Sequence, residues 1–215
     1  MTRCKNVLEI INKNAGKDYQ SPIKLGKTPI ANEMAKLYSE CKQGEQEFTE
    51  IIEEIAMKRG MISSVHKSVL DGTRRRIRSY YWGELQMEKY LGSPESISIF
   101  AEKDLEVNKP RFRVSLEIDG NRASNDELRK HNSLLDLHKE EGCLYALNEG
   151  AAKKIYFTED IDEAKGMIVT GKALKVQICV LIGQNDSYSD ANYLKEINDA
   201  IGKIMKSYEY VVKLK

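Results

Sequence analysis

Residues 111–119 read Arg-Phe-Arg-Val-Ser-Leu-Glu-Ile-Asp, and this stretch decides the fold class. Its polar and apolar side chains alternate strictly, which is the period of a β-strand with one face on a core and one face in water. The run 97–101, Ile-Ser-Ile-Phe-Ala, precedes it across a charged loop and predicts a neighbouring strand. We therefore expect a sheet to begin in the middle of the chain. Its solvent-facing side chains in 111–119 would be Arg111, Arg113, Ser115 and Glu117.

The chain before this stretch has a helical period instead. Apolar residues recur three and four positions apart in 6–14 and in 45–58. Thr28-Pro29 supplies an N-cap followed by a first-turn proline, which predicts another helix start. Gly60 ends the 45–58 helix, and a helix-turn-helix around this glycine is one interpretation of the pattern.

Strands and helices alternate after residue 119. Ser124 and Glu127 have the spacing of a capping box, which predicts a helix to about His138. A last amphipathic helix is expected over 189–207. Short apolar runs predict strands at 143–147, 154–158, 167–169, 176–182 and 209–214.

The order of these elements predicts an α+β fold, with a helical N-terminal half followed by a mixed, mainly antiparallel sheet with packed helices. The change of period divides the chain into a helical region, 1–95, and a sheet region, 96–215. The two regions are also compatible with one continuous domain.

Composition narrows the function classes. The 215 residues carry a formal net charge of +1, so any surface for a polyanion has to be a local patch. Apolar runs stay shorter than a bilayer span, and we expect a cytoplasmic protein that does not enter membranes. The four cysteines lack the Cys-x-x-Cys spacing, which predicts reduced thiols and no zinc site, with Cys41 and Cys179 buried.

Residues 73–82 read Thr-Arg-Arg-Arg-Ile-Arg-Ser-Tyr-Tyr-Trp and hold four arginines and the only tryptophan. Guanidinium groups match phosphate geometry, and aromatic faces stack on bases. Thr73 predicts the cap of a helix to about Leu91, with Ile77, Tyr81 and Leu85 on one face and Arg75, Arg78, Trp82 and Lys89 on another. The leading hypothesis is a non-catalytic nucleic-acid-binding module, with DNA expected. Its candidate binding residues are His66, Lys67, Arg74, Arg75, Arg76, Arg78, Tyr80 and Trp82.

The charges of the preceding segment leave a second interpretation open. Residues 40–56 contain six glutamates and one lysine, so an acidic helix runs directly into the basic segment. The arginines could pair with the glutamates of 45–54 across a helical hairpin. The chain would then be a protein-interaction or assembly subunit, with a protein partner or a second copy of itself.

A third interpretation is a magnesium-dependent nuclease of the restriction-enzyme type. Such enzymes hold Mg²⁺ with carboxylates from neighbouring strands beside the scissile phosphate. Asp104 follows one predicted strand, and Glu117 with Asp119 ends the next. These three carboxylates are the candidate catalytic residues of this alternative, although no lysine stands at the position that the family's acid-x-lysine pair would require.

Two histidines and the segment 144–150 also bear on function. His131 and His138 lie seven positions apart on one expected helix, and we interpret both as exposed histidines, not metal ligands. Leu144 to Gly150, Leu-Tyr-Ala-Leu-Asn-Glu-Gly, is similar to a strand-ending motif in DNA-reading domains attached to McrB-type restriction GTPases. That resemblance covers seven residues and implies a recognition component of a restriction or defence system.

Overall fold

The computed structural model describes residues 2–72, 75–104, 107–149 and 154–214. Its helices are α1 (Arg3–Asn14), α2 (Pro22–Leu25), α3 (Pro29–Arg59), α4 (Asn125–Asn132), α5 (Ile161–Val169) and α6 (Asp190–Lys213), with short 3₁₀ turns at Glu88–Tyr90 and Ser133–Asp136. The strands are β1 (Ile62–Val65), β2 (Leu70–Asp71), β3 (Arg76–Ile77), β4 (Tyr80–Gln86), β5 (Glu95–Asp104), β6 (Lys109–Ile118), β7 (Leu144–Glu149), β8 (Lys154–Thr158) and β9 (Ala173–Gly183).

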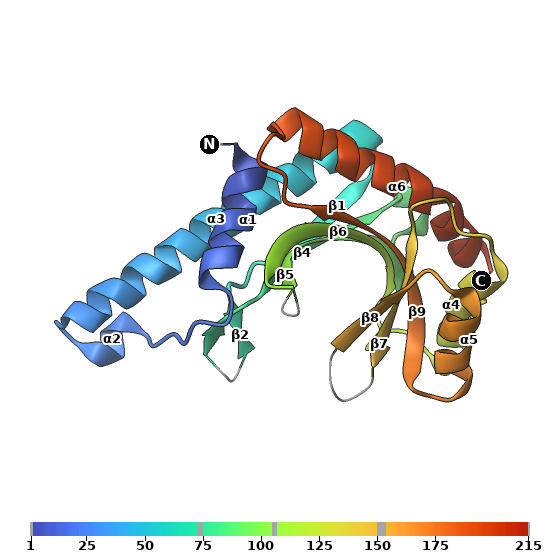
Figure 1. The fold of residues 1–215 in the computed structure, drawn as a ribbon, viewed down its shortest axis with the longest axis horizontal. Coiled ribbons are helices and arrows are strands. Elements are labelled where there is room, and N and C mark those ends of the chain that lie inside the picture. The colour runs from blue at the N-terminus through green and yellow to red at the C-terminus, as the bar shows by residue number, and fades with distance from the viewer. Residues whose placement is uncertain (1, 73–74, 105–106, 150–153, 215) are drawn as a thin grey trace. The chain divides into compact units, whose positions relative to one another are not determined.

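Seven strands form one sheet in the order β1-β4-β5-β6-β9-β7-β8, and β2 pairs with β3 in a separate ribbon (Figure 1). The sheet is mostly antiparallel, and helices precede it along the chain, so the predicted α+β class is confirmed. No helix among the described residues is long and apolar enough to cross a bilayer.

The chain forms two compact units. Unit 1 comprises Met1–Gly83, Ile99–Arg113 and Ile182–Glu196, and unit 2 comprises Glu84–Ser98, Val114–Leu181 and Ile197–Lys215. Strands β4, β5, β6 and β9 and helix α6 each pass from one unit into the other. Both units therefore contain segments from before and after residue 95.

The core of unit 1 is built by α1 and α3 against the sheet. Phe48, Ile51 and Ile52 of α3 are fully buried. The Tyr81 ring of β4 lies 5.9 Å from that of Phe48. Its hydroxyl donates to the backbone oxygen of Cys41 at 2.8 Å. These contacts fix α3 on the face of the sheet to which Tyr81 points.

Helix α3 is continuous where the sequence indicated two helices. Thr28 caps it, accepting from the Ala31 N–H at 3.1 Å, and Gly60 ends it in the left-handed conformation at φ 61°. Position 44, inside this helix, is a glycine. A Cβ there would approach the Tyr81 hydroxyl to 2.8 Å. Strand β1 follows Gly60 directly, so the helix-turn-helix interpretation is wrong.

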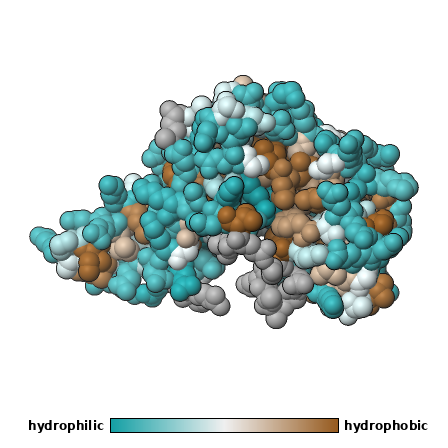
Figure 2. All heavy atoms as spheres, viewed as in Figure 1, coloured by the Kyte–Doolittle hydropathy of each residue, from teal (hydrophilic) through white to brown (hydrophobic). Residues whose placement is uncertain are grey.

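Apolar side chains stay exposed near α2, where Ile23 and Ile30 lie (Figure 2).

The helix predicted over 73–91 is also wrong, because β3, β4 and a 3₁₀ turn occupy the described part of that segment. Ile77, Tyr81 and Leu85 are buried, and their spacing of four residues fits a strand as well as a helix. Their neighbours Tyr80 and Trp82 lie on the opposite face of β4.

The core of unit 2 packs α6 against the apolar face of its strands. Ile201, Ile204 and Tyr208 of α6 are fully buried, and the Tyr208 ring meets that of Tyr90 edge-on at 5.9 Å. The apolar stripe continues to Val211, and α6 extends to Lys213, so the strand predicted at 209–214 is wrong.

Helix α5 replaces the strand predicted at 167–169. The Asp160 side chain caps it, accepting from the N–H groups of Asp162 and Glu163. The predicted capping box of α4 is confirmed, since Ser124 accepts from the Glu127 N–H at 3.3 Å and the Glu127 side chain accepts from the Ser124 N–H at 2.8 Å.

Candidate functional site

A row of four rings lies on one face of the sheet in unit 1, and we call it the ring row: His66, Tyr80, Trp82 and Phe100. The Trp82 and Phe100 planes are within 9° of parallel with centroids 6.1 Å apart. His66 lies 5.8 Å from Trp82, and Tyr80 lies 6.1 Å from Phe100. The row exists because positions 80 and 82 share a face of β4, and β5 pairs beside it and brings Phe100 alongside.

A buried arginine of β6, Arg113, packs against one ring of this row. The Arg113 guanidinium carbon lies 3.8 Å from the Phe100 centroid, although the residue is only 2% exposed. Its Nε donates to Glu102 at 3.1 Å, and Glu102 also accepts from Arg111 at 2.9 Å. Arg113 thus covers one face of the Phe100 ring and is itself held by a carboxylate.

This network corrects the expectation that the polar side of 111–119 faces water. Arg113 and Ser115 are buried, and the Arg111 side chain is only 16% exposed. The alternation in 111–119 correctly predicted a strand, but its polar side chains pair with those of the neighbouring strands, Arg113 with Glu102 of β5 and Glu117 with Lys175 of β9.

The cations of the basic segment lie between His66 and Tyr80 in the sequence. Lys67 and Arg75 are exposed, and Arg76 is exposed with a salt bridge to Asp18 at 2.9 Å. The half-buried Arg78 lies 5.7 Å from the Tyr80 centroid and donates from Nε to the Leu70 carbonyl at 2.8 Å. Arg74 and Thr73 lie outside the described residues.

The structure therefore brings four of the eight sequence-predicted binding residues into contact. His66 with Trp82 and Arg78 with Tyr80 form ring or cation–π contacts. Phe100 and Arg113 were missed, because neither is near the basic segment in sequence. The alternation of β5 and β6 was the only signal, since it placed both residues on the polar face of their strands.

Two of the three carboxylates of the nuclease alternative are engaged in ion pairs, and the third accepts a backbone N–H. Asp104 accepts from Arg111 at 2.6 Å in unit 1. In unit 2, Glu117 accepts from Lys175 at 3.2 Å and from the Gln177 amide. Asp119 accepts from the Asn121 N–H at 2.9 Å, which forms a turn. Within the described ranges, no group of three or more His, Cys, Asp or Glu side chains is arranged to hold a metal ion.

In unit 2, several polar side chains of the sheet are buried. Ser96 donates to Glu84 at 3.4 Å, and burial together with the charge of Asp119 raises the pKa of the Glu84 carboxyl. The Ser115 hydroxyl and the Gln177 amide oxygen are buried without a hydrogen-bond partner in the described part of the chain. Such groups are the usual sites of ordered water.

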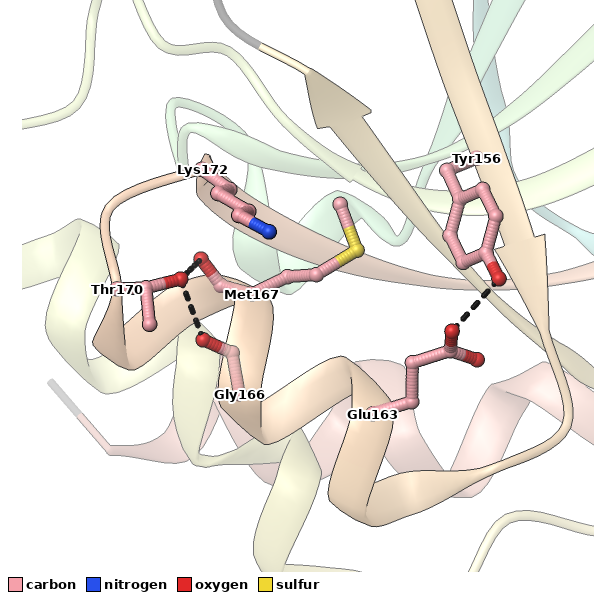
Figure 3. Close-up of a pocket in the computed structure, with 6 residues that line it drawn as sticks. All are labelled: Tyr156, Glu163, Gly166, Met167, Thr170 and Lys172. Carbon is pink, nitrogen blue, oxygen red and sulfur yellow. Dashed lines mark hydrogen bonds between the residues drawn. The ribbon is translucent and has the colours of Figure 1, made fainter.

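A separate open pocket of unit 2 lies between β8 and α5 (Figure 3). Glu163 accepts from the hydroxyls of Thr158 at 2.6 Å and Tyr156 at 2.7 Å, and these bonds hold its pKa below the ordinary value. The Thr170 hydroxyl donates to the Gly166 carbonyl at 2.7 Å. The Glu163 carboxylate is thus held by two neighbouring hydroxyls, which indicates a structural role for this side chain.

The sequence-based prediction for His131 is wrong. It was expected to be exposed, but it is fully buried, and its Nε2 lies 2.9 Å from the Val176 carbonyl oxygen. His138 is exposed, as expected. All four cysteines are free and buried, which confirms the expectation for Cys41 and Cys179.

Comparison with protein-family models and with curated proteins found no match to this chain. The segment that resembles the restriction-GTPase motif forms β7, which pairs with β8 from Tyr145 to Glu149, while Gly150 lies outside the described residues.

Proposed function

We propose that the chain binds nucleic acid, with DNA as the expected ligand, through the ring row and the basic segment 66–78 of unit 1. The observation that carries this proposal is the contact of His66, Trp82, Phe100 and Tyr80 in one row, with the Arg78 guanidinium 5.7 Å from the Tyr80 centroid. Aromatic faces and basic side chains together are the combination that nucleic-acid grooves use.

The ion pairs of α3 favour this proposal over internal charge pairing. Among the described residues, glutamates of α3 pair with Arg3, Lys13 and Lys42, and no ion pair links them to Arg75, Arg76 or Arg78. Within the basic segment, Arg76 makes a salt bridge to Asp18 that is exposed and weak, so the exposed Arg75 and Arg76 are available to phosphates.

The test is fluorescence anisotropy with labelled DNA and RNA over a salt titration. The variant Lys67→Glu/Arg75→Glu reverses two exposed cations whose side chains make no hydrogen bond in the described part of the chain. Each lost phosphate contact should reduce the slope of log K against log salt by roughly 0.7 to 0.9. The double variant should therefore flatten the slope by about 1.4 to 1.8 and weaken binding at low salt.

The matched control is Arg129→Glu/Lys130→Glu, which makes the same charge change at two exposed positions of α4 in unit 2. This control should keep the wild-type slope. An equal loss in both variants would mean that overall charge governs binding, and no binding at low salt would refute the proposal. Cleavage in the presence of Mg²⁺ would instead direct attention to Asp104, Glu117 and Asp119.

A further inference from the structure

We infer that the ligand of the ring row is a single-stranded nucleic acid, whose unpaired bases stack on Tyr80, Phe100, Trp82 and His66. This inference rests on the proposed function and deepens it. It follows from the spacing, the exposure and the support of the four rings.

The spacing of the rings is the first argument. Neighbouring centroids in the row are 5.8 Å to 6.1 Å apart. Bases within a duplex strand rise by only about 3.4 Å and already stack on one another. The ring planes are also inclined, by 32° between His66 and Trp82 and by 65° between Tyr80 and Phe100, so bases that stack on different rings of the row cannot all be parallel, which a single strand allows and a paired duplex does not.

The exposure of the rings is the second argument. Tyr80 is 36% exposed, His66 is exposed, and Trp82 and Phe100 are half-buried. Each ring is thus anchored on the sheet and still presents surface to a ligand. The neighbouring side chains of β4, Tyr81 and Leu85, are buried on the opposite face, so the ring row lies on the face of β4 that points away from α3.

The support of Phe100 is the third argument. Arg113 occupies one face of this ring at 3.8 Å, and Trp82 stacks on the ring from β4, on the other side of β5, so a base reaches Phe100 on the surface that it presents together with Trp82. A buried arginine is costly to desolvate, and Glu102 offsets that cost with a hydrogen bond at 3.1 Å. The pair fixes the plane of the ring, and a ring that is already held loses little entropy when a base stacks on it.

Trp82 is the only tryptophan of the chain, so the tryptophan fluorescence of the protein reports on the ring row. A base that stacks on the row should quench its fluorescence, whereas a ligand held by charge alone should not. The probes are a single-stranded oligothymidylate of about 16 nucleotides, at the upper end of known site sizes, its duplex with oligoadenylate, and heparin as a polyanion without bases. We expect quenching by the single strand only.

The variants separate stacking from charge. Phe100→Leu should weaken single-strand binding roughly 5- to 150-fold, the range for loss of one stacked base, and leave the salt slope unchanged. Tyr80→Leu is a second variant at a more exposed position, in case Phe100→Leu alters the fold. Tyr188→Leu is the control, since Tyr188 packs on Tyr193 outside the row.

The possible outcomes distinguish the two proposals. Salt-dependent binding in which both ring variants stay within twofold of wild type, or in which duplex and heparin quench Trp82 equally well, would overturn the inference and leave the proposed function standing. Failure of every nucleic acid to bind at low salt would overturn the proposed function, and the inference with it.

Discussion

Acid should destabilise the protein through His131, a fully buried side chain in unit 2. A carbonyl oxygen can only accept, so Nε2 carries the proton that is donated to Val176. Nδ1 is then an unprotonated nitrogen, and it is buried without a partner among the described residues. A second proton would place a charge and an unbonded N–H in the core.

The magnitude follows from the pKa of this imidazole. Burial, and secondarily the charge of Lys175, lower the pKa of His131 from 6.5 to about 3, against the hydrogen bond to Val176. The unfolded chain therefore binds the proton first, and stability is lost as pH falls below about 6.5, until the folded state titrates near pH 3. At pH 4.5 the difference of two pH units costs about 2.7 kcal/mol.

The assay is urea unfolding followed by far-ultraviolet circular dichroism between pH 7.5 and 4.5. His131→Gln keeps a side-chain N–H for Val176 but cannot titrate, so it should be less stable at neutral pH and lose less stability in acid. His138→Gln, at an exposed position of the same region, should follow the wild-type profile. Parallel profiles for wild type and His131→Gln would refute this account of the buried imidazole.

Three more outcomes are expected. Gly44→Ala should destabilise by about 1–3 kcal/mol in thermal unfolding, because its Cβ would meet the Tyr81 hydroxyl at 2.8 Å. Gly166→Ala, at an open helical position, should stabilise by up to about 1 kcal/mol, and the opposite order of the two glycine variants would contradict the packing described. Asp190→Ala should cost about 0.5–2 kcal/mol, because its carboxylate accepts from the first two N–H groups of α1. Burial disfavours ionisation of Asp190, but these bonds outweigh it and lower its pKa, so the contribution is present above the pKa of the unfolded chain and fades as pH falls through the folded one. The Cys41 thiol, whose pKa burial raises to about 11, should react with iodoacetamide only after urea is added, and rapid native labelling would argue against its burial.

Local sequence signals predicted those elements that local contacts specify. The Ser124–Glu127 capping box and the Thr28-Pro29 start both appear in the structure as hydrogen-bonded caps. The alternation in 111–119 became β6 because its period of two has no helical counterpart. In each case the residues that make the decisive contact are within a few positions of one another.

The segment 76–86 could not be assigned from its own pattern. Ile77, Tyr81 and Leu85 are equally compatible with a helix and a strand, and the choice was made by pairing with β5 and packing against α3. The same pairing placed Phe100 in the ring row. Its place beside Trp82 depends on strand register, which a single sequence does not reveal.

The division of the chain into two units has a consequence for how such a protein can be altered. The backbone alternates between them in six successive segments. A single cut in the chain therefore leaves at least one unit with pieces on both fragments. We expect that neither unit can be inherited, recombined or expressed as a stand-alone module, and that insertions are tolerated at loop tips, not at a boundary between units.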